Sequence, residues 1–504
     1  MLSGDSYSRM SKRLNIKARQ QRWHHSHSVL YLRHLGYRCI AQLSYSQMKR
    51  CGVGAVRLLI CFMIGLYLTA CTASNSPSNS PLNGSQVAIN QPLAHSPTLP
   101  PYSATEAMKY HDQGDIAIML SFSGGGTRAA AFSYGVLKAL HQTIINTEHG
   151  PQRLLDEVDF ISSVSGGSFT AAYYGLYGDK IFDDFESAFL YKDVGGDLFH
   201  TLFDPRLWFS SESRSAFAID YFQDSLFHHA TFADLQRTNG PTIILNATDL
   251  GSGVRFSFLQ EYFDLLCSDL SHYPVADAVM ASAAVPVMFS PVVLNNYPGC
   301  KPSNGFDLER QSVDPQIQRT IDGLRSYQNK QRRKYIHLVD GGISDNLGLL
   351  AIYDLVESSG GSEAFIDQVE VKPRSHMLII SVDASTEPYY QFEQSADEPS
   401  ITDTLSAITD TQLHRYNDAT KKVIWGNLLE WAELAEKEAG IATDPYFLHV
   451  TLKKIPHPTT RFDANTIPTD FTLDKNDVTL LVDEGERQLL NHPLYNQLLE
   501  QLND

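Results

Sequence analysis

IAIMLSFSGGGTRAAAFSYGVLKAL, residues 116–140, contains the strand, the turn and the helix that decide the fold of this chain. Residues 116–122 form an apolar run, which is typical of a strand buried on both faces. Three consecutive glycines follow at 124–126, and apolar residues then recur at helical spacing over 129–140. The stretch therefore predicts a strand, a tight turn and a helix in that order.

The same order of elements returns further along the chain. Residues 158–164 are predicted to form a second strand, and 166–177 again have a helical pattern. Other short apolar runs, which we interpret as strands, are Thr242–Ala247, Ile336–Val339 and Met377–Val382. Strands that alternate with helices predict an α/β domain. We expect a three-layer α/β/α fold with a largely parallel central sheet.

This α/β domain is expected to occupy residues 115–385, and residues 386–504 are expected to form an α/β extension packed on it. Within the extension we predict helices near 404–434 and 474–502 and a strand at 446–452.

Two segments of the main domain stand apart in composition. Asp183–His229 is rich in aromatic residues and is predicted to be helical. Lys301–Lys334 is a polar insertion that ends in the basic run Gln331–Lys334. We interpret that run as a solvated face.

The charge of the chain is unevenly distributed. Its 504 residues carry a net charge of −17, yet residues 1–70 hold eleven Lys and Arg against the single acid Asp5. Subtracting that surplus of ten positive charges leaves about −27 on the remainder. Such an acidic body repels nucleic acid and anionic lipid head groups, so we expect no nucleic-acid partner.

An N-terminal targeting segment is predicted at residues 48–70. A short basic stretch precedes the eleven-residue apolar run Leu58–Leu68, which is followed by Thr69, Ala70 and Cys71. This arrangement resembles a bacterial lipoprotein signal peptide, in which the cysteine becomes the lipidated first residue of the mature chain. A short transmembrane anchor is the alternative, but spanning a bilayer takes about 20 apolar residues.

The predicted signal peptide also determines how the residues before and after it are interpreted. Residues 1–47 are interpreted as a mis-assigned N-terminal extension, since signal peptides begin close to the start Met. Residues 71–114 are expected to be the lipidated Cys71 and a flexible tether, because Ser, Asn and Pro dominate the first thirty of them. Thr72 after the cysteine points, by the same resemblance, to the outer membrane of a bacterial envelope.

Two cysteines, Cys267 and Cys300, remain in the mature body. In an oxidising compartment they could form a disulfide, or they could stay as unpaired buried thiols, because the sequence does not report their separation.

Two turns have the composition that acyl transfer requires. The first, Ser123-Gly124-Gly125-Gly126-Thr127-Arg128, places bare backbone N–H groups at a helix N-terminus, which suits a developing oxyanion. A phosphate-binding loop is the alternative, but such a loop ends in Gly-Lys-Ser or Gly-Lys-Thr.

The second turn is Ser163-Val164-Ser165-Gly166-Gly167. It has the form of a nucleophile elbow with Ser163 in the first glycine position. Such an elbow strains the backbone of the central serine and needs minimal side chains around it, so that strand and helix can approach each other. We therefore predict Ser165 as the nucleophile.

A third motif, Asp340-Gly341-Gly342, directly follows the predicted strand 336–339 and so lies at a strand's carboxyl end. The three motifs in this order resemble the patatin-like phospholipase family. Further matching segments are Asn246–Asp249 and Ala281–Pro286. The resemblance covers residues 115–385 and identifies them as a catalytic domain.

The resemblance implies a lipid acyl hydrolase with a Ser-Asp dyad. Ser165 would attack the ester carbonyl, Asp340 would accept its proton, and the glycine loop would stabilise the oxyanion. Arg128 would meet a substrate phosphate or form an ion pair that supports the loop. The resemblance implies an acyl-ester lipid as substrate, a membrane reached through the lipid anchor, and neither metal nor organic cofactor.

Three alternatives remain open at this point. A Ser-His-Asp triad would draw on His111, His200, His272 or His337, although His337 within an apolar strand is expected to be a core residue. The same dyad could serve a thioesterase or a general carboxylesterase. A catalytically idle adaptor lipoprotein of the cell envelope is the third alternative, but an idle scaffold has no physical need for all three motifs.

Overall fold

The computed structural model describes residues 88–93, 100–110, 114, 116–147, 150–196, 214–238, 240–286, 288–300, 305–369, 374–387 and 390–503. Residues 82–504 form one compact unit, separate from residues 1–81. The predicted extension 1–47, the signal peptide 48–70 and Cys71 lie outside the described residues. Within those described ranges, no helix is both long and apolar enough to cross a membrane.

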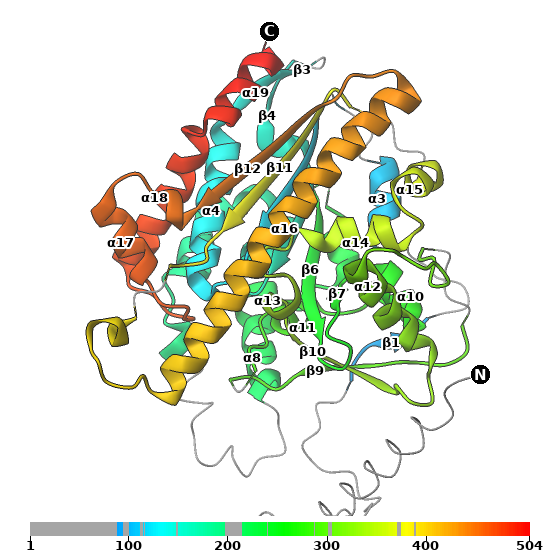
Figure 1. Ribbon diagram of the computed structural model, residues 1–504, viewed down its shortest axis with the longest axis horizontal. Coiled ribbons are helices and arrows are strands. Elements are labelled where there is room, and N and C mark those ends of the chain that lie inside the picture. The colour runs from blue at the N-terminus through cyan, green and yellow to red at the C-terminus, as the bar shows by residue number, and fades with distance from the viewer. Residues whose placement is uncertain are drawn as a thin grey trace, which may run out of the picture. The chain divides into compact units, whose positions relative to one another are not determined.

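An eight-stranded sheet forms the centre of the unit, in the order β12-β11-β2-β5-β6-β10-β9, with β7 paired to β6 (Figure 1). Its strands are β2 (Ile116–Phe122), β5 (Val158–Val164), β6 (Thr242–Asp249), β7 (Arg255–Ser257), β9 (Val292–Asn295), β10 (Tyr335–Asp340), β11 (His376–Asp383) and β12 (Asp444–Thr451). The strands from β12 to β6 pair in parallel, and β7, β9 and β10 pair antiparallel. The predicted α/β fold with a largely parallel sheet is confirmed.

Helices cover both faces of this sheet, as Figure 1 shows for α4 behind the strands and α16 in front. The first face carries α4 (Gly126–Gln142), α5 (Gly166–Tyr177) and α18 (Lys475–Leu490), and the second carries α12 (Pro315–Arg325), α14 (Leu350–Ser358) and α16 (Ile401–Ala439). Along β11, Leu378 and Ile380 belong to one apolar cluster, while Ile379 belongs to the other. This alternation follows from the two-residue period of a strand.

The C-terminal region is part of the same layered unit. β12 extends the sheet in parallel beside β11, and α18 packs directly on α4. A Cβ on Gly135 of α4 would lie 2.1 Å from the carbonyl oxygen of Val482, and one on Gly485 of α18 would lie 2.3 Å from that of Phe132. These facing glycines bring the two helix backbones close together. The predicted extension 386–504 therefore completes the main sheet and its helical cover.

The single helix predicted over 474–502 is two helices, α18 and α19 (Pro493–Asn503). Pro493 cannot continue a helix from the preceding turn, because it has no N–H to donate.

The tether predicted over residues 71–114 is wrong for its described C-terminal part. β1 (Gln91–Pro92) pairs with β8 (Ser268–Asp269), and α3 spans Ala104–Tyr110. The buried side chain of Asn90 donates to Ser268 Oγ at 3.0 Å. The buried Tyr102 hydroxyl donates to the carbonyl oxygen of Ile243 at 3.0 Å. A few polar contacts and one aromatic ring therefore hold this segment to the body despite its low apolar content.

The aromatic segment is helical where it is described. It contains α6 (Ile181–Phe185), a π-helical turn at Glu186–Leu190, α8 (Arg214–Phe222) and a second π-helical turn at Gln223–Phe227. Phe169 of α5 packs between Phe189 and Phe222, with ring centroids 4.7 Å from each. The aromatic side chains thus form part of the core beside α5.

The remaining elements are connections and short edges. They are β3 (Ile144–Thr147), β4 (Gly150–Arg153), α9 (Phe232–Gln236), α10 (Gln260–Leu265), α11 (Val275–Ser282), α13 (Gly342–Asp345), α15 (Ser362–Val369) and α17 (Pro458–Thr466), together with 3₁₀ turns at Leu154–Glu157, Gly178–Lys180, Ser326–Gln328, Gln391–Gln394 and Leu452–Lys454.

Candidate active site

The glycine loop and the serine elbow are neighbours because β2 and β5 are adjacent parallel strands. Phe122 at the end of β2 pairs with Ser163 in β5, so both strands turn into their helices at the same edge of the sheet. A Cβ on Gly166 would lie 1.9 Å from the carbonyl oxygen of Gly126. The two turns are therefore in backbone contact, which only glycine permits at position 166.

Ser165 has the strained backbone predicted for a nucleophile elbow, with φ 51° and ψ −121°. Its N–H donates to Ser282 Oγ at 2.9 Å, which holds the elbow against the C-terminus of α11. Gly167 is equally constrained, since a Cβ there would lie 2.7 Å from the Cβ of Phe122. The Ser163 hydroxyl is buried and donates to the carbonyl oxygen of Ile244 at 3.3 Å, so a small polar residue suits the first motif position.

Asp340 reaches the same edge of the sheet from the opposite direction. Its strand β10 is antiparallel to β6 and pairs with Ala247, Thr248 and Asp249, which extend beyond the end of β5. The Asp340 N–H donates to the carbonyl oxygen of Ala284, and the Gly341 N–H donates to that of Ser282, both at 3.0 Å. A Cβ on Gly341 would lie 2.2 Å from the carbonyl oxygen of Asn246, so this turn is also pressed onto the sheet.

The side chain of Ser165 lies close enough to the carboxylate of Asp340 to lower its pKa. The Gly342 N–H donates to Asp340 Oδ1 at 2.7 Å. Asp340 is 8% exposed, and this burial raises the pKa of its carboxyl from 3.8 to about 6, against the lowering effects of Gly342 and Ser165. The structure thus brings together the serine and the aspartate that lie 175 positions apart in the sequence.

The three glycines of the first turn are not equivalent. The Gly124 N–H donates to the carbonyl oxygen of Asn346 at 3.0 Å. Among the described residues, the N–H groups of Gly125 and Gly126 have no hydrogen-bond acceptor. Both residues have positive φ, 142° and 60°. Of the three glycines predicted to donate to an oxyanion, Gly124 has its N–H bonded to Asn346, while the N–H groups of Gly125 and Gly126 have no acceptor among the described residues.

The side chain of Arg128 connects the glycine loop to two distant segments of the chain. Its Nε donates to the carbonyl oxygen of Ala384 at 3.0 Å, and its Nη1 donates to that of Ile467 at 2.7 Å. The side chain is buried, which lowers the pKa of the guanidinium to about 10, while the charges of Asp383 and Asp410 raise it. Of the two predicted roles, this geometry supports loop bracing, through backbone carbonyls in place of a direct ion pair.

A loop near the C-terminus, residues 467–471, also braces the glycine turn. The Thr127 N–H donates to the carbonyl oxygen of Asp470 at 2.9 Å, and a Cβ on Gly126 would lie 2.6 Å from that oxygen. Phe471 packs edge-on against Phe289, with ring centroids 5.6 Å apart. The sequence gives no signal for these contacts, because they use backbone carbonyls more than 300 positions away.

A chain of buried amides connects the active-site turns to α16. Asn346 Nδ2 donates to Ser385 Oγ at 3.1 Å, and Asn417 Nδ2 of α16 donates to the same oxygen at 3.3 Å. The Oδ1 atom of Asn346 lies 3.1 Å from the position of a Cβ on Gly342. Asn346 therefore lies between the glycine loop and the Asp340 turn, and sequence reasoning did not assign it a role.

Of the histidines available for a triad, the two that the structure describes, His272 and His337, do not bond to Ser165 or Asp340. His111 and His200 lie outside the described residues. His272 is exposed and pairs with Asp269 through Nδ1. The prediction that His337 is a core residue is wrong: its side chain is exposed, because it points to the solvent face of β10. Within the described part of the chain, no histidine is hydrogen-bonded to Ser165 or Asp340.

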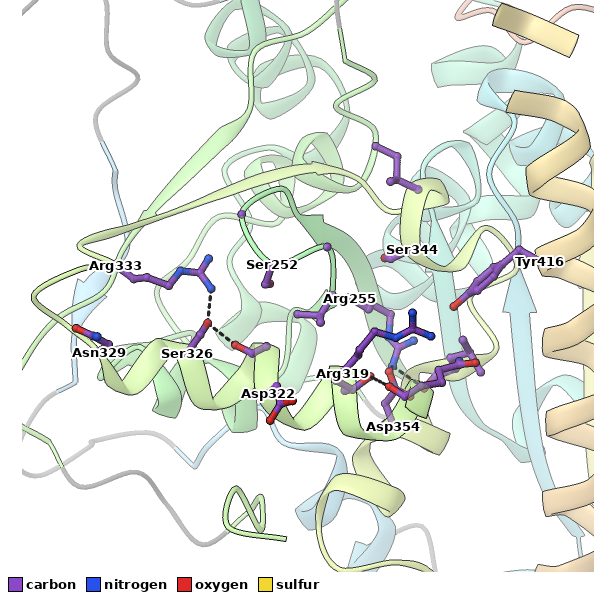
Figure 2. Close-up of a pocket in the computed structure, with 18 of the residues that line it drawn as sticks. Ser252, Arg255, Arg319, Asp322, Ser326, Asn329, Arg333, Ser344, Asp354 and Tyr416 are labelled. Carbon is purple, nitrogen blue, oxygen red and sulfur yellow. Dashed lines mark hydrogen bonds and ion pairs between the residues drawn. The ribbon is translucent and has the colours of Figure 1, made fainter. Parts of the chain in front are cut away.

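A cavity of about 830 Å³ lies next to the turn after Asp340 but is not lined by Ser165 or Asp340 (Figure 2). The β6–β7 turn, α12, α13 and Tyr416 of α16 surround it. Arg333 is one of its lining residues and forms an ion pair with the buried Asp249 at 2.6 Å. The interpretation of Gln331–Lys334 as only a solvated face is therefore wrong for Arg333.

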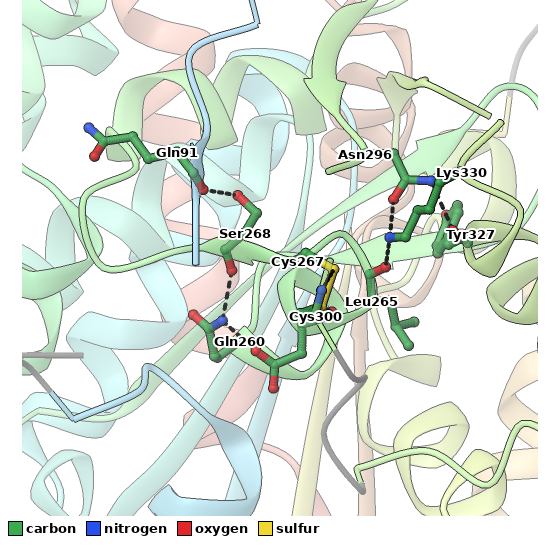
Figure 3. The surroundings of a disulfide bond; sticks show 10 residues. Gln91, Gln260, Leu265, Cys267, Ser268, Asn296, Cys300, Tyr327 and Lys330 are labelled. Carbon is green, nitrogen blue, oxygen red and sulfur yellow. Dashed lines mark hydrogen bonds between the residues drawn. A yellow bond between two sulfur atoms is a disulfide. The ribbon is translucent and has the colours of Figure 1, made fainter. Parts of the chain in front are cut away.

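Cys267 and Cys300 form a disulfide, with their Cα atoms 5.5 Å apart (Figure 3). It joins the turn after α10 to the segment after β9. Nearby, Lys330 donates to the carbonyl oxygen of Leu265 and to Asn296 Oδ1, so the same corner is also fixed by hydrogen bonds. Of the two states left open by the sequence, the structure has the disulfide.

In the part of the chain that the structure describes, no group of three or more His, Cys, Asp and Glu side chains could hold a metal ion.

Comparison with known proteins identifies the domain that carries these turns. Residues 120–353 match the family model of patatin-like phospholipases. The chain contains a patatin-like phospholipase domain. The match includes the glycine loop, Ser165 and Asp340, and ends before α15. Patatin-like phospholipases are lipid acyl hydrolases, so the match supports this class of activity for the domain.

Solved structures of low sequence identity also resemble this chain. VipD from Legionella pneumophila has 13% identity and a TM-score of 0.30, with 77% of this chain and 67% of that chain covered. Human GIVD cytosolic phospholipase A2 has 14% identity and a TM-score of 0.33, with 79% of this chain covered. The chain spans 62% of the length of that human protein. A search of curated proteins found no match.

Proposed function

We propose that this protein hydrolyses the acyl esters of phospholipids, or of related glycerolipids, through a Ser165–Asp340 dyad. The observation that carries the proposal is that the Ser165 side chain lies beside the buried carboxylate of Asp340, with Ser282 accepting hydrogen bonds from both turns. Next to them, the N–H groups of Gly125 and Gly126 have no acceptor among the described residues. A nucleophile, its base and two oxyanion donors are the parts that acyl transfer needs.

In the first half of the reaction, Ser165 Oγ attacks the carbonyl carbon of the ester while its proton moves to Asp340. The N–H groups of Gly125 and Gly126 stabilise the oxyanion of the tetrahedral intermediate. The intermediate collapses, the C–O bond to the glycerol breaks, and Asp340 gives the proton to the leaving alkoxide oxygen. The products are an acyl-enzyme ester on Ser165 and a lysolipid.

In the second half, water attacks the acyl-enzyme and Asp340 accepts a proton from it. Collapse of the second tetrahedral intermediate returns a proton to Ser165 Oγ and releases the fatty acid. A carboxylate with an ordinary pKa is a weak base for this role. The pKa of Asp340 is raised to about 6, which is closer to neutral pH. Transfer of the Ser165 proton to this carboxylate is therefore less unfavourable than transfer to an ordinary one.

Labelling with a fluorophosphonate probe, combined with release of fatty acid from defined phospholipid dispersions, tests the proposal. We expect stoichiometric labelling of the wild-type protein at Ser165, and loss of both labelling and hydrolysis in Ser165→Ala. Deleting a catalytic serine costs about 10⁶-fold in kcat in a well-studied serine protease. Ser121→Ala is the matched control, since the buried Ser121 hydroxyl has no hydrogen-bond partner.

The same experiment separates the alternatives. Hydrolysis that survives both Ser165→Ala and Asp340→Asn would reject the dyad. Labelled protein that cleaves thioesters or short carboxylesters but not phospholipids would favour a thioesterase or carboxylesterase. Folded protein without any serine adduct would favour an idle adaptor of the cell envelope.

The proposal includes attachment to the bacterial outer membrane through lipidated Cys71. Residue 88 is the first described residue of the body, so a short Ser-, Asn- and Pro-rich segment would separate the lipid from it. We expect the wild-type protein to partition into detergent and Cys71→Ser to remain in the aqueous phase, with Cys61→Ser as control. A mature chain that begins before Cys71 by mass spectrometry would reject this attachment.

A further inference from the structure

The cavity beside the turn after Asp340 is lined by an unusual set of charged residues for so acidic a chain. Four arginines line it: Arg255, Arg319, Arg332 and Arg333. Figure 2 shows Arg333 and Asn329 at one end, Arg319, Asp354 and Tyr416 at the other, and Ser252 between them. At about 830 Å³ the cavity has the size of an ordinary small-molecule site.

Two of the four arginines are neutralised by the protein itself. Arg255 is buried and ion-paired with Asp345 and Asp354. Arg333 is ion-paired with Asp249 and also donates to Ser326 Oγ.

The carboxylates that line the cavity are also engaged. Asp354 pairs with Arg255, and Asp322 accepts a hydrogen bond from Arg325 at 2.5 Å and one from Gln318 at 3.0 Å. Burial raises the pKa of both Asp345 and Asp354, against the lowering effect of the Arg255 charge.

Arg319 and Arg332 have no such partner. Nε of Arg319 donates to the carbonyl oxygen of Pro315 at 3.2 Å, which leaves the Nη atoms of its guanidinium available. Among the described residues, no carboxylate forms an ion pair with Arg319 or Arg332. Two uncompensated guanidinium groups on one cavity favour an anion within it.

The rest of the lining supplies hydroxyl groups. Hydroxyl-bearing residues come from five separate segments and are Ser252, Thr320, Ser326, Ser344 and Tyr416. Three of these hydroxyls already donate within the protein, those of Ser252, Thr320 and Ser326, so they offer a ligand acceptor oxygens. Such acceptors suit a ligand that carries hydroxyl groups in addition to its anionic group.

We propose that this cavity binds a phosphate ester that carries free hydroxyl groups, with Arg319 and Arg332 as its charge partners. Guanidinium groups recognise phosphate through paired N–H donors, and no described carboxylate compensates the charge of either arginine. The ligand is either a soluble phosphate ester or the head group of a lipid. The overall negative charge of the chain does not oppose this, because the local charges are closest to the ligand.

The cavity is connected to the proposed catalytic base. Ser344 Oγ, on its wall, is 2.8 Å from Thr248 Oγ1, and Thr248 Oγ1 donates to the carbonyl oxygen of Asp340 at 2.8 Å. Ser344 belongs to α13, whose first residue, Gly342, donates to the Asp340 carboxylate. A ligand that orders α13 would therefore change the position and hydrogen bonding of the Asp340 carboxylate.

Calorimetric titration of the purified full chain with sn-glycerol 3-phosphate tests the soluble arm, and flotation with phosphatidylcholine vesicles containing phosphatidic acid tests the lipid arm. We expect saturable binding in at least one arm, weakened about tenfold or more by Arg319→Gln and by Arg332→Gln. Arg237→Gln is the matched control, because Arg237 is an exposed arginine outside the cavity.

Binding in the first arm alone assigns a soluble ester, and binding in the second alone assigns a lipid head group. The proposal is overturned if neither probe binds, or if both arginine variants bind like wild type while circular dichroism shows them folded. The titration is repeated in Ser165→Ala, so that binding is measured without hydrolysis. The binding result therefore does not depend on whether the Ser165–Asp340 dyad is catalytic.

Discussion

The glycine loop after β2 and the serine elbow after β5 are both strand-to-helix turns rich in glycine, yet they are held in different ways. The elbow is held through its own backbone: Gly166 and Gly167 pack against the turn after β2, and the Ser165 N–H donates to Ser282 of α11. The glycine loop leaves two N–H groups free and is braced by distant parts of the chain, Ala384, Ile467 and Asp470.

The difference follows from what each turn presents. The elbow presents a side chain, so its own backbone can be fully used in local packing and hydrogen bonds. The glycine loop presents backbone N–H donors. If these donors formed hydrogen bonds within the protein, they could no longer bind an oxyanion. Its support must come from carbonyls and a guanidinium elsewhere in the fold. Both turns are held by tertiary contacts, but only the turn that presents a side chain can use the N–H group of its functional residue in them.

The largest expected effect comes from forcing the two turns apart. A Cβ in Gly166→Ala would overlap the carbonyl oxygen of Gly126, which is 1.9 Å away, so we expect loss of hydrolysis and a lower melting temperature. Gly426→Ala is the control, since a Cβ on Gly426 within α16 meets nothing within 4 Å. It should keep full activity and gain about 0.5–1 kcal/mol of stability. An active, stable Gly166→Ala protein would refute the close contact.

Removing the brace of the glycine loop is expected to act on turnover. In Arg128→Gln, two carbonyl oxygens lose a buried charged donor, and we expect kcat to fall about 10- to 100-fold with little change in KM. Steady-state kinetics on one phospholipid measure both constants. A rise in KM at constant kcat would instead assign Arg128 to substrate binding, the role that the buried guanidinium argues against.

The activity of Ser165 in the elbow is expected to depend on pH, because its proposed base, Asp340, titrates. We expect kcat/KM to fall with a slope of one below about pH 6, as the carboxylate becomes protonated. Stability should change in the opposite sense, because a carboxyl whose folded pKa is raised is stabilised by protonation. Asp340→Asn should therefore exceed wild type in melting temperature at pH 7.5, with the difference shrinking towards pH 5. A difference independent of pH would contradict the raised pKa.

The smallest effect on activity is expected at the disulfide, which belongs to neither turn. Cys267 and Cys300 are 33 positions apart, and closing a loop of that length stabilises a protein by about 2–4 kcal/mol. We expect Cys267→Ser with Cys300→Ser to lower the urea midpoint and leave kcat/KM unchanged. A matching loss of activity would show that this corner also supports the catalytic turns.

Much of the fold was predictable because its signals are local. The bounds of β2, β5 and α5 agree with the predicted ranges 116–122, 158–164 and 166–177, since buried parallel strands are near-continuous apolar runs. The predictions failed where a few tertiary contacts outweighed composition. Asn90 and Tyr102 hold a Ser- and Pro-rich segment to the body, and His337 lies on the exposed face of an otherwise apolar strand.

The sequence by itself determined the α/β layers, the elbow at Ser165 and the motif at Asp340, because each depends on residues within a few positions of one another. Only the tertiary structure decided which glycine N–H groups are free, that Arg128 braces the loop, and that Arg332 and Arg333 line a cavity. These features depend on backbone carbonyls and charges brought together from distant parts of the chain. Such partners leave no periodic or compositional mark in the sequence.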